Sequence, residues 1–208
     1  MYPPSMARPA ASKSENIDYT KRFSELYFGY ASNLAPSSIK GRCPDSLFCG
    51  LARLEDYKWQ INDTGFGNII PSKGDHVYGA LVFLSPRDEA GLDESEGVPW
   101  LYQKHSLEVE RINADGSASG QKVQVMTYVD VERTEEGVID RGYVVWIVKA
   151  IREASAIGMP MEYVEKYLRP WLPESTEVEE NQEIVMVRVM RSKDAVAAKP
   201  GSTALGDA

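Results

Sequence analysis

The 208-residue sequence contains only two cysteines, Cys43 and Cys49, and only two histidines, His76 and His105. Two cysteines are too few for a disulfide framework. No Cys/His cluster supplies the roughly four ligands that a structural zinc ion needs. We therefore expect both cysteines to be reduced thiols in or near the core, and we expect the protein to use no metal.

Long apolar runs are also missing. No stretch approaches the roughly 20 apolar residues of a membrane-spanning helix, and the N-terminal segment lacks the apolar core of a signal peptide. These two absences predict a cytoplasmic protein with no membrane partner.

Positive charge is in deficit, with 31 acidic against 23 basic residues and a formal net charge of −8. Because phosphate contacts need clustered Lys and Arg, we expect no nucleic-acid partner. The sequence also has no GxGxxG motif, no Walker loop and no strand–helix–strand alternation, so it gives no support to nucleotide-dependent chemistry.

Both ends of the chain are poor in apolar residues. Residues 1–21 are rich in Pro, Ser and Ala, and residues 192–208 in Ala, Gly and Ser, so we predict a disordered leader and a disordered tail. Between them we expect a single domain over residues 22–191. The mixed periodicity of residues 180–191 does not distinguish strand from helix, and the structure of residues 172–191 stays open.

Apolar and alternating patterns predict the strands, and capping residues predict the helices. We expect strands at residues 26–30, 47–61, 68–71, 76–84, 100–112 and 121–130, the last two joined by a hairpin turn at 113–116. We expect helices from Pro36, from Ser85 as N-cap to about Glu96, and over 144–156 and 161–171. Since most strands precede the two late helices, the order predicts an α+β fold whose sheet can curl into a barrel.

The first candidate site is the turn of small residues Tyr30-Ala31-Ser32-Asn33-Leu34, which directly follows a strand. Consecutive backbone N–H groups in such a turn can point into one cavity and bind a carboxylate or an oxyanion. A simple turn with Asn33 in the left-handed conformation explains the same residues.

The second candidate site is an acidic stretch at the expected end of the helix that follows Ser85, with Asp93, Glu94 and Glu96. A helix C-terminus disfavours carboxylates, and a buried carboxylate is a candidate for proton transfer. A solvated acidic face that ends at Gly97 is the plainer interpretation.

Taken together, the two stretches resemble the gamma-glutamylcyclotransferase family. That family has an aromatic strand leading into a Tyr-Gly-Ser-Asn-Leu loop and, well downstream, Leu-Asp-x-x-Glu-Gly-Val followed within a few residues by Tyr. Here the loop is residues 30–34, and the second motif is residues 92–98 with Tyr102. Residues 158–163 resemble the family's late Gly-Leu-Pro-x-x-Tyr junction, and Tyr143, just ahead of the late helices, is similar to a family pocket tyrosine.

The resemblance implies a small mixed, partly closed β-barrel with helices packed outside. It also implies a lyase or acyltransferase reaction on a small gamma-glutamyl substrate, from glutathione metabolism or from secondary metabolism. The α-amine attacks its own γ-carbonyl, 5-oxoproline forms, and an amine or amino acid leaves. No water, metal or cofactor takes part in this reaction.

The resemblance further implies a role for each site residue. Glu96 would accept the proton of the attacking amine and return it to the leaving nitrogen. The amides of Ser32, Asn33 and Leu34 would hold the α-carboxylate or the developing oxyanion. Ala31 would line the pocket, and a set of tyrosine hydroxyls would complete it, namely those of Tyr30, Tyr102 and Tyr143.

Two departures from the family pattern concern the substrate. Ala31 replaces the loop glycine. It would be strained by about 1–2 kcal/mol if that position needs a positive φ, and otherwise its methyl group narrows the pocket. Pro99-Trp100 replaces a glycine-containing segment of the family and makes the segment between Glu96 and Tyr102 one residue shorter. Trp100 would therefore change the shape of the pocket where the leaving group binds. These changes favour a gamma-glutamyl conjugate of a larger metabolite over a plain housekeeping substrate.

The alternative function is that of a catalytically idle or repurposed relative, which binds a small carboxylate-bearing metabolite or assists another ring closure. The position of Glu96 discriminates between the two, because the enzyme needs this carboxylate beside the amides of residues 32–34. The leaving group, the pathway and the oligomeric state, a homodimer included, stay open at this level.

Overall fold

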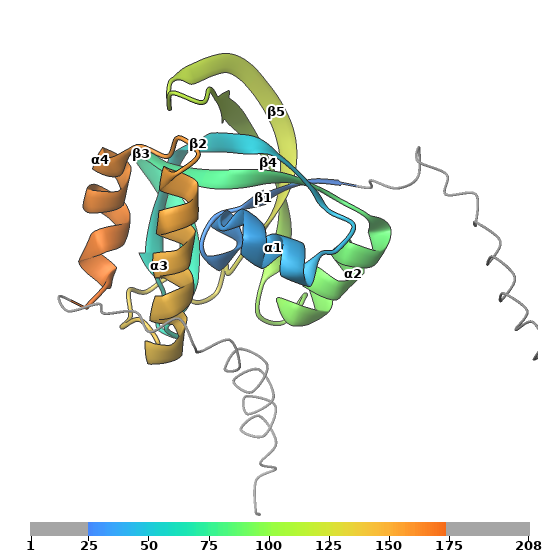
Figure 1. Cartoon of the computed structure of the whole chain (residues 1–208). Helices are drawn as coiled ribbons and strands as arrows, with labels where there is room; N and C mark the ends of the chain where they lie inside the picture. Colours follow the sequence, from blue (N-terminus) through green and yellow to red (C-terminus); the bar gives the residue numbers. More distant parts are fainter. Residues whose placement is uncertain (1–24, 174–208) are drawn as a thin grey trace, which may run out of the picture.

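The computed structural model describes residues 25–173, which form a five-stranded barrel with helices outside it (Figure 1). The strands follow the order β1-β3-β2-β4-β5, and each neighbouring pair in this order is antiparallel. A parallel pairing of β1 with β5 closes the ring. The predicted α+β barrel is therefore confirmed, whereas the predicted leader, the predicted tail and residues 174–191 lie outside the described residues.

The strands are β1 Glu25–Gly29, β2 Leu47–Ile61, β3 Gly67–Leu84, β4 Gln103–Ile112 and β5 Ala118–Val129. The prediction of two separate strands at 68–71 and 76–84 is wrong, because β3 runs through both. The register between β2 and β3 shifts at Asp56, because this one residue of β2 lies opposite the four polar or small residues 72–75 of β3. Asp56 has a φ of 59°, and its carboxylate accepts a hydrogen bond from the N–H of Gly74 at 2.9 Å. The pairing of β2 with β3 can therefore continue on both sides of the bulge.

The helices are α1 Pro36–Arg42, α2 Pro86–Ser95, α3 Arg141–Ser155 and α4 Met161–Tyr163, followed by a π-helical turn η3 Val164–Leu168 and a 3-10 turn η4 Arg169–Trp171. Ser85 caps α2 as predicted and accepts a hydrogen bond from the N–H of Asp88 at 3.1 Å. The prediction of one regular helix over 161–171 is wrong. Pro170 has no N–H to donate, so the last turns cannot continue an α-helical hydrogen-bond pattern.

The helix α3 starts three residues before the predicted position. Asp140 is its N-cap, and the Asp140 carboxylate accepts a hydrogen bond from the N–H of Gly142 at 2.8 Å. Tyr143 consequently lies in the first turn of α3 rather than ahead of the late helices.

The core fills the barrel and the space beneath the helices. β3 lies between β1 and β2, and its segment 77–82 is buried throughout, as its continuous apolar sequence predicts. Cys43 is buried and Cys49 half-buried, and both are free thiols, as predicted. Residues 25–173 contain no cluster of three or more potential metal ligands, and none of their helices is long and apolar enough to cross a membrane.

The site follows from how the helices are placed. α1 and α2 lie next to each other at one side of the barrel (Figure 1). The short 3-10 turn η2 Ser32–Leu34 connects β1 to α1 and packs against α3. The end of α2 and the turn after β1, far apart in the sequence, are therefore both within reach of α1.

Candidate active site

The turn after β1 folds back tightly over its own strand. Within it, the N–H of Leu34 donates to the carbonyl of Ala31 at 3.0 Å, and all three residues of η2 are buried. A Cβ on Gly29 would lie 2.7 Å from the carbonyl oxygen of Asn33, so only glycine allows this approach. Asn33 does not have a positive φ, which among the described non-glycine residues occurs at Asp56 alone. The interpretation of this turn as a left-handed Asn33 is therefore wrong.

Ala31 has a negative φ of −70°, so this position does not need the positive φ that favours glycine. Of the two expectations for this departure from the family glycine, the strained one is wrong. The methyl group instead faces Gly67 at the start of β3, where an added Cβ would lie 2.6 Å from the Ala31 Cβ. The Ala31 methyl group therefore fills space between the turn and the start of β3.

Glu96 follows the last residue of α2 and is directed at the small-residue turn. Its N–H donates to the carbonyl of Leu92 at 2.7 Å, and Gly97, with a φ of 66°, then reverses the chain. The side-chain amide of Asn33 donates to Oε1 of Glu96 at 3.3 Å. The structure thus brings the two sequence motifs together.

The Glu96 side chain is sheltered rather than fully buried, with an exposed fraction of 15%. This differs from the expectation of a buried carboxylate. It also differs from the interpretation of a solvated acidic face, which fits only Glu94, since Glu94 is exposed. Asp93 accepts a hydrogen bond from the hydroxyl of Tyr128 at 2.8 Å and pairs with Lys104 at 2.6 Å.

Arg42 is a site residue that sequence reasoning missed. It is the last residue of α1, and its Nη2 lies 3.0 Å from Oε1 of Glu96. Its Nη1 donates to Oδ1 of Asn33 at 2.7 Å, and its Nη2 also donates to the hydroxyl of Ser95. The available signal was a cation in the last turn of the helix that starts just after the small-residue turn, but no motif marks it.

The three tyrosines predicted for the pocket already have hydrogen-bond partners. Tyr30 donates its hydroxyl hydrogen to the carbonyl of Tyr128 at 2.6 Å, and Tyr102 donates to the carbonyl of Gly67 at 3.1 Å. The hydroxyl of Tyr143 accepts a hydrogen bond from the N–H of Ser32 at 3.4 Å. The first two hydroxyls are directed at backbone carbonyls, whereas that of Tyr143 faces the small-residue turn.

Burial raises the pKa of all three of these tyrosine hydroxyls above the ordinary value, and the charge of Glu96 adds to the shift. They therefore stay protonated near neutral pH, which suits hydrogen-bond donors rather than bases.

The backbone N–H groups of the turn differ in whether they already donate a hydrogen bond. The N–H of Leu34 is used within the turn, and the N–H of Ser32 makes the long contact to Tyr143. Within residues 25–173, the N–H of Asn33 donates to no group. The anion-binding capacity expected of three amides therefore rests on Ser32 and Asn33.

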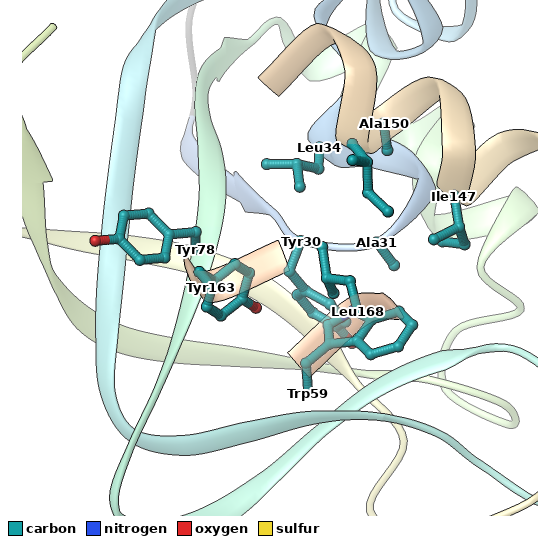
Figure 2. A pocket seen from close by; sticks show the side chains of 10 residues that line it. Tyr30, Ala31, Leu34, Trp59, Tyr78, Ile147, Ala150, Tyr163 and Leu168 are labelled. Carbon is teal, nitrogen blue, oxygen red and sulfur yellow. The ribbon is translucent and has the colours of Figure 1, made fainter. Parts of the chain in front are cut away.

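A small cavity adjoins the turn and is lined mainly by apolar side chains, including Ala31, Trp59, Ile147 and Leu168 (Figure 2). Its volume of about 10 Å³ has room for about one water molecule, so it is not itself a substrate pocket. Tyr30 also lines this cavity, whereas Glu96 does not (Figure 2).

Comparisons with known proteins agree with the motifs. A family model described as gamma-glutamyl cyclotransferase, AIG2-like, matches residues 27–145. The chain is 36% identical to a gamma-glutamylcyclotransferase of Mus musculus over 83 residues, which is 35% of this chain and 44% of the mouse protein. It is 29% identical to a gamma-glutamylcyclotransferase of Homo sapiens over 152 residues, which is 68% of this chain and 76% of the human protein. A solved structure of a gamma-glutamyl cyclotransferase superimposes with a TM-score of 0.62 at 26% identity, covering 81% of this chain and 98% of the other.

Proposed function

Because the chain belongs to the gamma-glutamyl cyclotransferase, AIG2-like family, we propose that it cyclises a gamma-glutamyl amide to 5-oxoproline and releases an amine or amino acid. The observation that carries this proposal is the 3.3 Å hydrogen bond from Asn33 to Glu96. It places the Glu96 carboxylate, which is 15% exposed, beside a turn in which the N–H of Asn33 donates to no group of residues 25–173.

Glu96 acts as the proton-transfer group. The lone pair of the neutral α-amine attacks the γ-carbonyl carbon, and the Glu96 carboxylate accepts the proton that this nitrogen loses. When the bond from that carbon to the leaving nitrogen breaks, Glu96 returns the proton to the leaving nitrogen. The nucleophile and the carbonyl belong to one substrate, so the protein contributes mainly by binding the folded conformer.

The turn supplies the groups that bind negative charge. The amides of Ser32 and Asn33 hold the substrate carboxylate or the oxyanion that develops at the γ-carbonyl. The protonated hydroxyl of Tyr143 lies beside the Ser32 amide and adds a donor on the same side. In this proposal, Glu96 and these groups carry out the ring closure.

The substrate is a gamma-glutamyl conjugate with a leaving group larger than a small amino acid. Ala31 narrows the space near Gly67, which disfavours a compact substrate that relies on that space. Trp100, four residues after Glu96, has an exposed fraction of 83% and offers an aromatic face to a bulky leaving group.

A comparison of Glu96→Gln with Glu94→Gln tests the function. Glu94 lies at the same helix end but is exposed, so it is a matched control. With a panel of gamma-glutamyl compounds and mass spectrometry of 5-oxoproline, we expect Glu96→Gln to lose at least about a hundredfold in kcat. Glu94→Gln should match the wild type. Full turnover by Glu96→Gln would exclude Glu96 as the base, and a wild type that releases no 5-oxoproline would favour the idle relative.

A further inference from the structure

The ends of α1 and α2 are joined by an ion pair between Arg42 and Glu96. The guanidinium Nη2 lies 3.0 Å from Oε1 of the carboxylate, and the two side chains are 23% and 15% exposed. A carboxylate at a helix C-terminus faces the negative end of the helix dipole. Arg42 therefore stabilises a charge that the α2 backbone alone would disfavour.

Asn33 connects this ion pair to the small-residue turn. Arg42 donates through Nη1 to Oδ1 of Asn33 at 2.7 Å. Because arginine only donates hydrogen bonds, this contact fixes the Asn33 amide with its nitrogen on the opposite side. That nitrogen donates to the hydroxyl of Tyr27 at 2.8 Å and to Oε1 of Glu96 at 3.3 Å.

Both donors of this network reach the same carboxylate oxygen. Oε1 of Glu96 accepts from Arg42 and from Asn33. Its other oxygen, Oε2, has no hydrogen-bond partner within residues 25–173, and it does not count among their buried unpaired polar atoms. The network thus holds the carboxylate by one oxygen and leaves the other accessible.

We propose that Arg42 is a positioning residue that fixes Glu96 through Oε1, so that Oε2 is the oxygen that exchanges the proton with the substrate. This inference rests on the proposed function. In the first step an N–H bond of the neutral α-amine breaks, its proton bonds to Oε2, and the nitrogen bonds to the γ-carbonyl carbon. In the second step the bond from that carbon to the leaving nitrogen breaks, and the proton moves from Oε2 to the leaving nitrogen, which restores the carboxylate.

Arginine is the residue that this role needs. Its planar fork presents two Nη atoms, one to Asn33 and one to Glu96, whereas the single ammonium of a lysine is a point charge on a flexible stem. Burial lowers the pKa of Arg42, but the charge and hydrogen bond of Glu96, together with Tyr27 and Cys43, raise it further, so that its pKa lies above the ordinary value. Arg42 is therefore charged near neutral pH.

The test compares Arg42→Lys and Arg42→Gln in the full chain, on the gamma-glutamyl compound that the wild type converts best. Lysine keeps the charge, but its single ammonium replaces the two Nη atoms that contact Asn33 and Glu96. We therefore expect kcat to fall at least about tenfold while KM stays within about twofold. Glutamine also removes the charge, which makes a neighbouring carboxylate harder to ionise. The acid limb of its pH profile should therefore move to higher pH, whereas that of Arg42→Lys should stay in place.

Arg87 provides the matched control. It pairs with Asp45 at 2.7 Å at the opposite end of α2, and its side chain is 69% exposed. Arg87→Lys and Arg87→Gln should keep the wild-type kcat and pH profile. A thermal melt of each variant separates loss of folding from loss of turnover, and Arg42→Lys serves alone if Arg42→Gln does not fold.

The outcomes distinguish the two proposals. If the wild type releases 5-oxoproline and both Arg42 variants match it in kcat and in the acid limb, the positioning role is overturned and the proposed function stands. If the wild type releases no 5-oxoproline from any compound of the panel, the proposed function fails first, and the role of Arg42 falls with it.

Discussion

Among single residues near the site, Ala31 and Gly67 lie so close together that a larger side chain at one leaves too little space for the other. A Cβ on Gly67 would lie 2.6 Å from the Cβ of Ala31 and 3.2 Å from both Cζ2 of Trp59 and the hydroxyl of Tyr143. The backbone of Gly67 also accepts the hydrogen bond of Tyr102. This point of β3 therefore touches the small-residue turn and two of the pocket tyrosines at once.

The two positions should compensate each other in a double-mutant cycle. We expect Gly67→Ala to lower the free energy of unfolding by about 1–3 kcal/mol through overpacking. Adding Ala31→Gly removes the closest contact and should restore part of that loss. Ala31→Gly alone should raise kcat/KM on small gamma-glutamyl amino acids. Urea unfolding and turnover over a substrate panel measure both effects.

Strictly additive unfolding energies in this cycle would show that Ala31 does not limit the space at Gly67. An unchanged substrate profile for Ala31→Gly would show that the methyl group is neutral for specificity, whatever its effect on stability.

Among the elements, β1 and β5 form the strand pair with the fewest paired residues in the barrel. The two strands are paired at one position, Tyr27 with Met126. Side chains support this seam: Thr127 donates its hydroxyl hydrogen to the carbonyl of Phe28 at 2.8 Å, and Tyr30 donates to the carbonyl of Tyr128 at 2.6 Å. Closure therefore depends on side-chain hydrogen bonds as much as on the backbone.

Tyr30→Phe should weaken this seam. The substitution leaves the carbonyl of the buried Tyr128 without its donor, so we expect a loss of about 1–3 kcal/mol in the free energy of unfolding. Turnover of the folded protein should change less than about threefold, since the hydroxyl is directed at a carbonyl rather than at Glu96. Tyr57→Phe is the control, because Tyr57 is a half-buried residue of β2 for whose hydroxyl the described residues 25–173 show no hydrogen-bond partner. A large loss of kcat with unchanged stability would instead assign the Tyr30 hydroxyl to the substrate.

For the whole molecule, Cys43 is a reporter of global unfolding. Its side chain is fully buried, and burial raises the pKa of the Cys43 thiol to about 12. Only the thiolate reacts with alkylating agents, and with that pKa on the order of one thiol in ten thousand is ionised at pH 8.

Iodoacetamide at pH 8 should therefore label Cys43 at least about a hundredfold more slowly than an unfolded thiol, at a rate that follows the opening of the whole domain. Cys49 is half-buried and serves as the internal reference. Mass spectrometry across a urea series measures both rates. Labelling of Cys43 in native buffer as fast as that of Cys49 would show that the region between α1 and β2 opens on its own.

The local pattern of the sequence was enough for most elements. The bounds of β2, the Ser85 cap of α2 and the central position of β3 follow from alternation, capping chemistry and a continuous apolar segment. The prediction failed at the Asp56 bulge, because the pairing of β2 with β3 decides that feature. It also failed in the last helical turns, where Pro170 supplies no N–H for a regular α-helical pattern. At the site, the motifs identified Glu96 and the small-residue turn but not Arg42, whose spacing to either motif carries no periodic signal.

The sequence by itself determined the family motifs, the order of strands and helices, and the choice of Glu96 over its acidic neighbours as the residue to examine. Only the tertiary structure decided that Arg42 and Asn33 hold one oxygen of Glu96, while the other has no hydrogen-bond partner among the described residues 25–173. The physical reason is that local sequence fixes which residues begin and end a helix. The meeting of the ends of α1 and α2 depends on the barrel that packs both helices onto one side.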